Sequence, residues 1–151
     1  MDMRFNYKTV IPEGYAAMVS LDDYVKGCGL EPSLVQLVEM RVSQINGCAY
    51  CIDLHWREAH AAGESDQRLF ELDAWREAPG YSDRERAALD WAEAVTLLTP
   101  GHVPDETYKR ARKVFSEKEL ADLTLAVVVI NAWNRLSISF RLPPLEWKTT
   151  K

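Results

Sequence analysis

The sequence predicts an all-α fold in one domain, and three observations support this prediction. Apolar residues recur every three to four positions along most of the chain, and no segment alternates as a half-buried strand does. Capping boxes at Ser82-Asp83-Arg84-Glu85 and Ser116-Glu117-Lys118-Glu119 are typical of helix starts. With 151 residues, 47% of them hydrophobic, the chain is long enough to bury a core. We therefore expect about seven helices in a single domain, residues 1–151.

Three helices are expected in the first half of the chain. Pro32 suits the first turn of the second helix, whose many apolar residues predict a mostly buried element. Asn46-Gly47 is a strong turn signal, and the good helix formers that follow predict a third helix with both neighbouring cysteines in its first turn. The expected helices are residues 13–26, 32–45 and 48–62, after an irregular segment 1–12.

Four more helices are expected in the second half. Ser65 can cap the first of them, the two capping boxes start two others, and Pro104 opens a short basic helix. The last helix is too uniformly apolar for a surface element, so we expect it to form the core of the domain. Three of the expected ranges are residues 66–75, 83–98 and 120–137, with the Pro104 helix before the last.

The charge pattern excludes several classes of partner. A net charge of −5 gives no basic surface for nucleic acid or for an anionic membrane. No uninterrupted apolar run reaches the roughly 18 residues of a membrane span, and the first residues lack the apolar region of a signal peptide. We therefore expect a cytoplasmic protein, in which a Cys-x-x-Cys pair is more often redox-active than structural.

Cys48, Cys51 and His55 form the clearest chemical motif. Their spacing of three and four residues places all three side chains on one helix face. The N–H groups at a helix start stabilise a thiolate, the two thiols can close a disulfide, and the imidazole can accept a proton from Cys51. An inert disulfide and a zinc site with His55 are the alternatives. Structural zinc needs four ligands, and the remaining candidates, among them the lone Cys28, show no partner motif.

The run Arg41–His55, with its core NGCxYCxxxH, resembles the alkylhydroperoxidase D (AhpD)-like, carboxymuconolactone decarboxylase superfamily. Asn131-Ala132-Trp133-Asn134-Arg135 is similar to the last-helix motif of its single-domain, peroxidase-related branch, so the resemblance covers about residues 34–141. It implies that Cys51 is the peroxidatic cysteine, Cys48 the resolving cysteine and His55 a proton relay. The helix dipole alone would favour Cys48 as the more acidic thiol.

The sequence departs from this family at Gln36. Family members often carry a relay glutamate twelve residues before the first cysteine, where this chain has a carboxamide that cannot accept a proton as a carboxylate does. Glu39, one helical turn further on, and Glu93, in an apolar setting that would raise its pKa, are the candidate replacements. The alternative for both is an ordinary solvated or ion-paired glutamate.

We expect a small apolar pocket beside the thiols, with Tyr50 and Trp133 in its lining. Asn131 and Asn134 either line the same pocket or bind neighbouring helices; in both cases buried amides require hydrogen-bond partners.

The resemblance predicts a cysteine-dependent peroxidase for alkyl hydroperoxides or hydrogen peroxide. An external dithiol must then reduce the disulfide that the cycle forms. No metal, haem or flavin motif is visible. The superfamily also implies a homo-oligomer, a trimer or hexamer. A thiol–disulfide oxidoreductase, a thiol-independent decarboxylase-like enzyme and a zinc-holding or oligomeric scaffold are the alternative functions.

Overall fold

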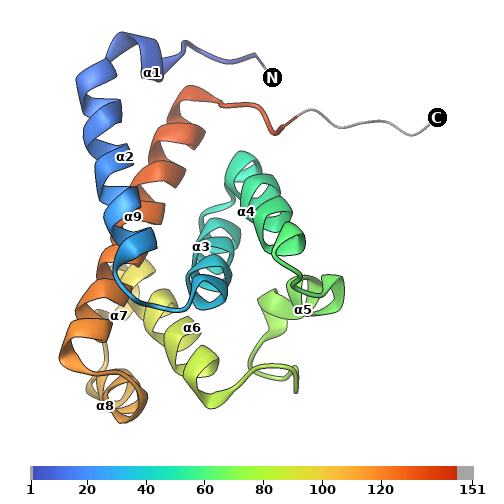
Figure 1. Cartoon of the computed structure of the whole chain (residues 1–151), viewed down its shortest axis with the longest axis vertical. Helices are drawn as coiled ribbons and strands as arrows, with labels where there is room; N and C mark the ends of the chain where they lie inside the picture. Colours follow the sequence, from blue (N-terminus) through green and yellow to red (C-terminus); the bar gives the residue numbers. More distant parts are fainter. Residues whose placement is uncertain (1, 146–151) are drawn as a thin grey trace.

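The computed structural model describes residues 2–145, and all regular secondary structure in this range is helical (Figure 1). The predicted all-α class is confirmed, and no strand occurs among these residues. The elements are α1 (Tyr7–Val10), α2 (Pro12–Gly27), α3 (Pro32–Asn46), α4 (Ala49–Ala61), α5 (Asp66–Glu71), the 3₁₀ helix η1 (Leu72–Ala74), α6 (Asp83–Thr96), α7 (Leu98–Gly101), α8 (Asp105–Val114) and α9 (Glu117–Phe140).

The seven expected helices correspond to α2 to α6, α8 and α9, and two short helices were not predicted. Residues 1–12 are not wholly irregular, because the Asn6 side chain accepts a hydrogen bond from the Lys8 N–H and caps α1. Tyr7 of α1 is buried against Phe140, with ring centroids 5.6 Å apart. The expected fourth helix divides into α5 and η1, and α7 adds one turn after α6.

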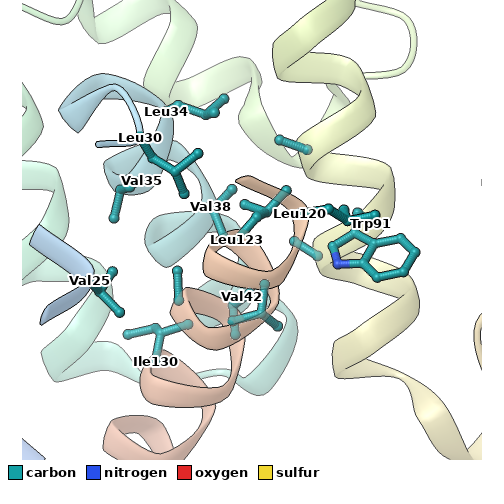
Figure 2. Close-up of a cluster of buried hydrophobic side chains, with 14 of the residues drawn as sticks. Val25, Leu30, Leu34, Val35, Val38, Val42, Trp91, Leu120, Leu123 and Ile130 are labelled. Carbon is teal, nitrogen blue, oxygen red and sulfur yellow. The ribbon is translucent and has the colours of Figure 1, made fainter. Parts of the chain in front are cut away.

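Helix α3 lies at the centre of the domain, between α9, α4 and α6 (Figure 1). One side of α3 packs into a large apolar cluster with α6, α8 and α9, to which it contributes Val35, Val38 and Val42 (Figure 2). Its other side contributes Leu37 and Met40 to a second cluster with α4, α5, η1 and α6. Burial on two sides explains the continuous apolar sequence of this helix.

Helix α9 is the one described helix that is long and apolar enough to cross a membrane by length and composition. The core helix of a soluble protein passes the same test. Buried residues of α9, such as Leu123 and Val127, face the core formed with α3, and Asn134 is fully buried with hydrogen bonds to α3. The predicted core position of this helix is thus confirmed.

A tight corner joins α3 to α4 and places the cysteines. Gly47 has φ 68° and ψ 34°, the left-handed conformation in which glycine ends a helix without steric cost. The Gly47 N–H donates to the Gln44 carbonyl and the Cys48 N–H to the Ser43 carbonyl, which satisfies the end of α3. Cys48 is then the N-cap of α4, one position before the first turn in which the sequence placed it.

We predict that Gly47→Ala lowers the free energy of unfolding by about 1–2 kcal/mol, the cost of a left-handed conformation for an L-residue. A Cβ at Gly47 would meet no atom within 4 Å, so the loss would come from the backbone alone. Gly27→Ala is the matched control, because its φ is not positive and its Cβ position is equally open. Urea unfolding of the two variants measures the difference, and equal stability of both would contradict this account.

Candidate active site

The Cys48–Cys51 pair occupies the start of α4. The two residues form a disulfide with their Cα atoms 5.3 Å apart, and both are buried. The Cys51 N–H donates to the Cys48 sulfur at 3.3 Å, so this sulfur takes the place of an N-cap oxygen. The N–H groups of the first turn therefore face the Cys48 sulfur, where they stabilise negative charge.

His55, one turn after Cys51 in α4, lies between two carboxylates. Its Nδ1 is 3.2 Å from Glu58 Oε2 and 3.4 Å from Glu39 Oε2. The imidazole and Glu39 are both buried, whereas the Glu58 side chain is 43% exposed. Because Nδ1 faces the carboxylates, Nε2 is the ring nitrogen left for exchange of a proton with another partner.

The two cysteines border different hollows. Cys51 and His55 line a cavity of about 290 Å³, together with Tyr50, Trp133 and Glu39. Cys48 lines a second, more open cleft of about 440 Å³ between the start of α4 and the end of α9. Tyr50 and Ser137 take part in both linings, so they separate the approaches to the two sulfurs.

Glu39 takes the position beside His55 that the family pattern assigns to a residue at Gln36. Gln36 is half-buried on α3 and is absent from the lining of the Cys51 cavity. Glu39 lies one turn later on α3, and the packing of α3 against α4 brings its carboxylate to the imidazole.

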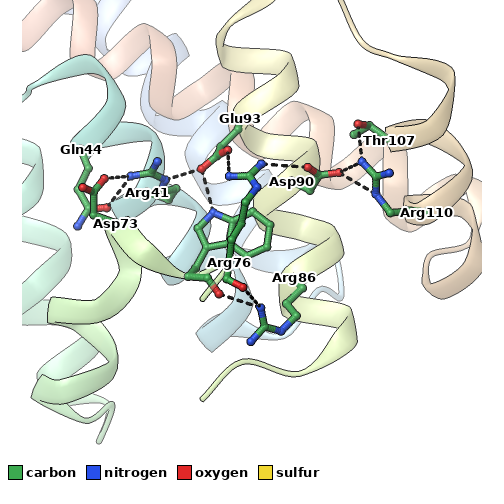
Figure 3. Close-up of polar contacts among 10 residues, drawn as sticks. Arg41, Gln44, Asp73, Arg76, Arg86, Asp90, Glu93, Thr107 and Arg110 are labelled. Carbon is green, nitrogen blue, oxygen red and sulfur yellow. Dashed lines mark hydrogen bonds and ion pairs between the residues drawn. The ribbon is translucent and has the colours of Figure 1, made fainter. Parts of the chain in front are cut away.

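Glu93 does not line the Cys51 cavity and its net pKa is lowered, so the expectation of a relay glutamate with a raised pKa at this position is wrong. Its carboxylate accepts hydrogen bonds from Arg41 Nε at 2.8 Å, Trp75 Nε1 at 2.9 Å and Arg76 at 2.5 Å (Figure 3). Burial raises the pKa of Glu93, but these hydrogen bonds and the Arg41 charge outweigh it, and the net pKa is lowered. Glu93, with its lowered pKa, therefore joins α6 to α3 and to the segment that follows η1.

Asn131 and Asn134 lie outside the Cys51 cavity, because their amides bind the end of α3. Both side-chain oxygens accept from Asn46 Nδ2, at 3.0 Å and 2.8 Å. The Asn134 amide also donates to Ser43 Oγ at 3.1 Å. Of the two predicted roles, the structure thus gives these residues the binding of neighbouring helices.

The two carboxylates at His55 differ in pKa. Burial raises the pKa of Glu39 to about 7, an effect that the His55 charge opposes and that Asp22 and Glu58 reinforce. The hydrogen bond to His55 lowers the pKa of Glu58. Near neutral pH, Glu39 can therefore take up or release a proton, while Glu58 stays ionised.

Sequence reasoning missed Glu58 and the aromatic residues from the N-terminal helices. Glu58 follows His55 by three residues on α4, so helical spacing alone would have identified it. Tyr7 and Tyr15 also line the cavity, and the Tyr15 ring packs edge-on against Trp133 with centroids 5.8 Å apart. No local pattern indicates that residues so early in the chain reach the site.

Sequence comparison places these features in a known family. The profile described as the carboxymuconolactone decarboxylase family matches residues 12–94, which contain Glu39, both cysteines and His55. The uncharacterized protein YdfG of Bacillus subtilis (strain 168) is 42% identical over 139 residues, covering 92% of this chain and 95% of YdfG. The chain belongs to the carboxymuconolactone decarboxylase family.

Similar solved structures support the AhpD-like resemblance. The protein ATU0492 of Agrobacterium tumefaciens, of unknown function and named as a candidate AhpD antioxidant defence protein, matches with a TM-score of 0.94. It is 38% identical, with 97% of this chain and 100% of that chain covered. The debrominase Bmp8 shares the fold at a TM-score of 0.80 and 19% identity, covering 89% of this chain and 72% of its own. Family membership therefore supports an enzyme but leaves its reaction to be argued from the site.

We predict that Glu39→Gln stabilises the protein above neutral pH. The folded-state pKa of about 7 lies above the ordinary 4.5, so the folded protein holds this proton more tightly than the unfolded chain. Stability from Glu39 is complete below about pH 4.5 and falls as pH rises to about 7, by up to roughly 3 kcal/mol. Glutamine removes that loss, so the gain should appear at about pH 8 and be small at about pH 5.

Urea unfolding at the two pH values measures this gain. Glu58→Gln is the control, because the pKa of Glu58 is lowered and its neutralisation offers no gain at high pH. A Glu39→Gln effect of the same size at both pH values would contradict the assignment of a buried, proton-exchanging carboxyl group.

Proposed function

We propose that this protein is a dithiol peroxidase that reduces alkyl hydroperoxides or hydrogen peroxide. One observation carries the proposal: Cys51 shares a small cavity with His55 and the buried Glu39, while Cys48 is bonded to it from outside that cavity. A nucleophile, a proton acceptor and a resolving thiol are the parts that such a reaction requires. The AhpD-like relatives are consistent with this chemistry.

The cycle starts from the reduced dithiol. The Cys51 thiol gives its proton to His55 Nε2, and the thiolate attacks the terminal oxygen of the hydroperoxide. The O–O bond breaks, the proton passes to the departing oxygen, and an alcohol or water leaves. Cys51 is then a sulfenic acid, which the Cys48 thiolate attacks to form the disulfide and release hydroxide, protonated to water. The cysteine pair has lost two electrons and the peroxide has gained them.

Glu39 and Glu58 would tune His55 during these transfers. A carboxylate at Nδ1 raises the basicity of the imidazole and fixes its orientation. Glu58 remains ionised, and Glu39, with a pKa of about 7, can hold the second proton when imidazolium forms. Glu39 is therefore the carboxylate that we assign to the place of the glutamate missing at Gln36.

An external dithiol must return the electrons. The cleft at Cys48 offers this reductant a route that leaves the peroxide cavity free. Attack on the Cys48 sulfur would expel Cys51 as a thiolate into the cavity that contains His55. Two further parts of the proposal stay predictions: a cytoplasmic location, expected from the sequence composition, and a homo-oligomeric assembly, implied by the family resemblance.

We predict that Cys51→Ser abolishes rapid reaction with peroxide, whereas Cys48→Ser still reacts once and stops at the sulfenic acid. Stopped-flow oxidation of the reduced protein by cumene hydroperoxide, with thiols counted before and after, tests this. Cys28→Ser is the matched control, because Cys28 is the free cysteine of the described chain and should leave the rate unchanged. A wild-type rate no faster than that of an ordinary thiol would reject the peroxidase and favour disulfide exchange.

We also predict that Glu39→Gln slows oxidation of Cys51 by about 10- to 100-fold at neutral pH, the lower part of the range for proton-transfer catalysis. Below its pKa of about 7 the Glu39 carboxyl is protonated and accepts nothing, so the wild-type rate should rise as pH passes this value. Burial is the largest cause of this raised pKa, and the charged groups that modify it are His55, Asp22, Glu58 and Lys26. The rise should be lost in Glu39→Gln and kept in Gln36→Ala; equal pH profiles in all three proteins would exclude the relay.

A further inference from the structure

The residues around His55 offer a second property, which can be tested without peroxide turnover. We propose that Glu39, His55 and Glu58 bind a divalent transition-metal ion, for which Zn²⁺ is the best match. Each residue offers one ligand atom, and the three atoms lie within 4.8 Å of one another. This ligand set differs from the zinc site considered from the sequence, because it contains neither cysteine.

The two distances from His55 Nδ1 to the carboxylate oxygens suit a tetrahedral ion. Bonds of about 2.0–2.1 Å from Zn²⁺ to imidazole nitrogen and carboxylate oxygen require ligand atoms roughly 3.3–3.4 Å apart at the corners of a tetrahedron. His55 Nδ1 lies 3.2 Å from Glu58 Oε2 and 3.4 Å from Glu39 Oε2. An octahedral ion such as Mg²⁺, with similar bond lengths, would require neighbouring ligand atoms to be about 3.0 Å apart.

The Glu39 carboxylate is an acceptor to which no described residue donates a hydrogen bond. Nδ1 carries at most one proton, yet two carboxylates face it. Glu58 takes the shorter contact, and the Glu39 side chain accepts no hydrogen bond from any residue between 2 and 145. Glu39 is only 6% exposed, and no described residue donates to its carboxylate, so a species in the cavity that it lines must supply the partner that this group needs when it is ionised. A cation between the three groups would supply that partner to both glutamates at once.

The surroundings favour a positive ion and leave it a route. Asp22 and Asp23 also line the cavity, so its four carboxylates outnumber its two ammonium groups, those of Lys8 and of Lys26, which pairs with Asp22 at 2.7 Å. The Glu58 side chain is 43% exposed, so one ligand is accessible from solvent while Glu39 closes the inner side. Imidazole nitrogen and carboxylate oxygen are both ligands of Zn²⁺, and the open cavity leaves a fourth position for water.

The test is a Zn²⁺ titration of the oxidised protein in competition with a chromophoric zinc indicator. The Cys48–Cys51 disulfide and a Cys28→Ser background remove all thiol ligands, so binding does not depend on the proposed peroxidase activity. We expect one Zn²⁺ per chain, and at least a tenfold loss of affinity in Glu58→Gln. This variant is chosen because the Glu58 side chain is partly exposed, so its substitution should leave the fold intact. Glu39→Gln and His55→Ala should lose at least as much.

His60 provides a matched control. His60 on α4 forms the other described pair with a carboxylate, and its Nδ1 lies 3.0 Å from Asp66 Oδ1 at the start of α5. This pair is exposed and has no second carboxylate. His60→Ala should therefore bind Zn²⁺ as the parent does. Equal losses in His60→Ala and Glu58→Gln, or no stoichiometric binding by the parent, would overturn the proposal.

Co²⁺ supplies a readout of the geometry. A four-coordinate Co²⁺ ion absorbs visible light far more strongly than a six-coordinate one, so the oxidised protein should give intense bands that Glu58→Gln weakens. Weak, six-coordinate bands from the parent would contradict the tetrahedral site.

Discussion

The corner between α3 and α4 is the constraint on which the site depends. One short segment, Gly47 and Cys48, ends α3 and starts α4. Its two N–H groups bind the last carbonyls of α3, and the Cys48 sulfur accepts the hydrogen bond that caps α4. Helix α9 holds this corner from the other side, through the hydrogen bonds of Asn131 and Asn134 to Asn46 and of Asn134 to Ser43. A rotation of either helix would break this set and would also move Cys51 away from the cavity it shares with Glu39.

The site is placed in this core at a cost in stability. Helix α3 is apolar on two sides, and Glu39 interrupts this pattern with a carboxyl group that is 6% exposed. Ser43 is also fully buried on α3, but it is satisfied by the Glu39 carbonyl and the Asn134 amide. Glu39 has only a shared histidine, so its ionisation opposes folding near neutral pH. A group that is buried, incompletely paired and able to exchange a proton is typical of a functional position rather than of a structural one.

Local sequence patterns were sufficient for much of this architecture. The capping boxes located the starts of α6 and α9, and helical spacing placed Cys51 and His55 on one face of α4, because these relations lie within one or two turns of a helix. The choice among Gln36, Glu39 and Glu93 depended on how α3 and α6 pack against α4, which no local pattern determines. The partners of Glu93 come from two distant places in the chain, Arg41 on α3 and the adjacent residues Trp75 and Arg76. The contribution of Tyr7 and Tyr15 to the cavity is likewise a product of tertiary packing.

The structure also reconciles two arguments about which thiol is activated. The helix dipole favours Cys48, whose sulfur accepts the Cys51 N–H at the N-cap, while the imidazole lies on the same face as Cys51. In the proposed cycle these effects act at different steps. Cys51 needs a base that can take its proton and return it to the departing oxygen, which a fixed dipole cannot do. Cys48 needs only to be a thiolate when the sulfenic acid forms, and a helix N-terminus provides this without proton transfer. The N-cap position of one cysteine and the histidine beside the other therefore serve successive halves of one reaction.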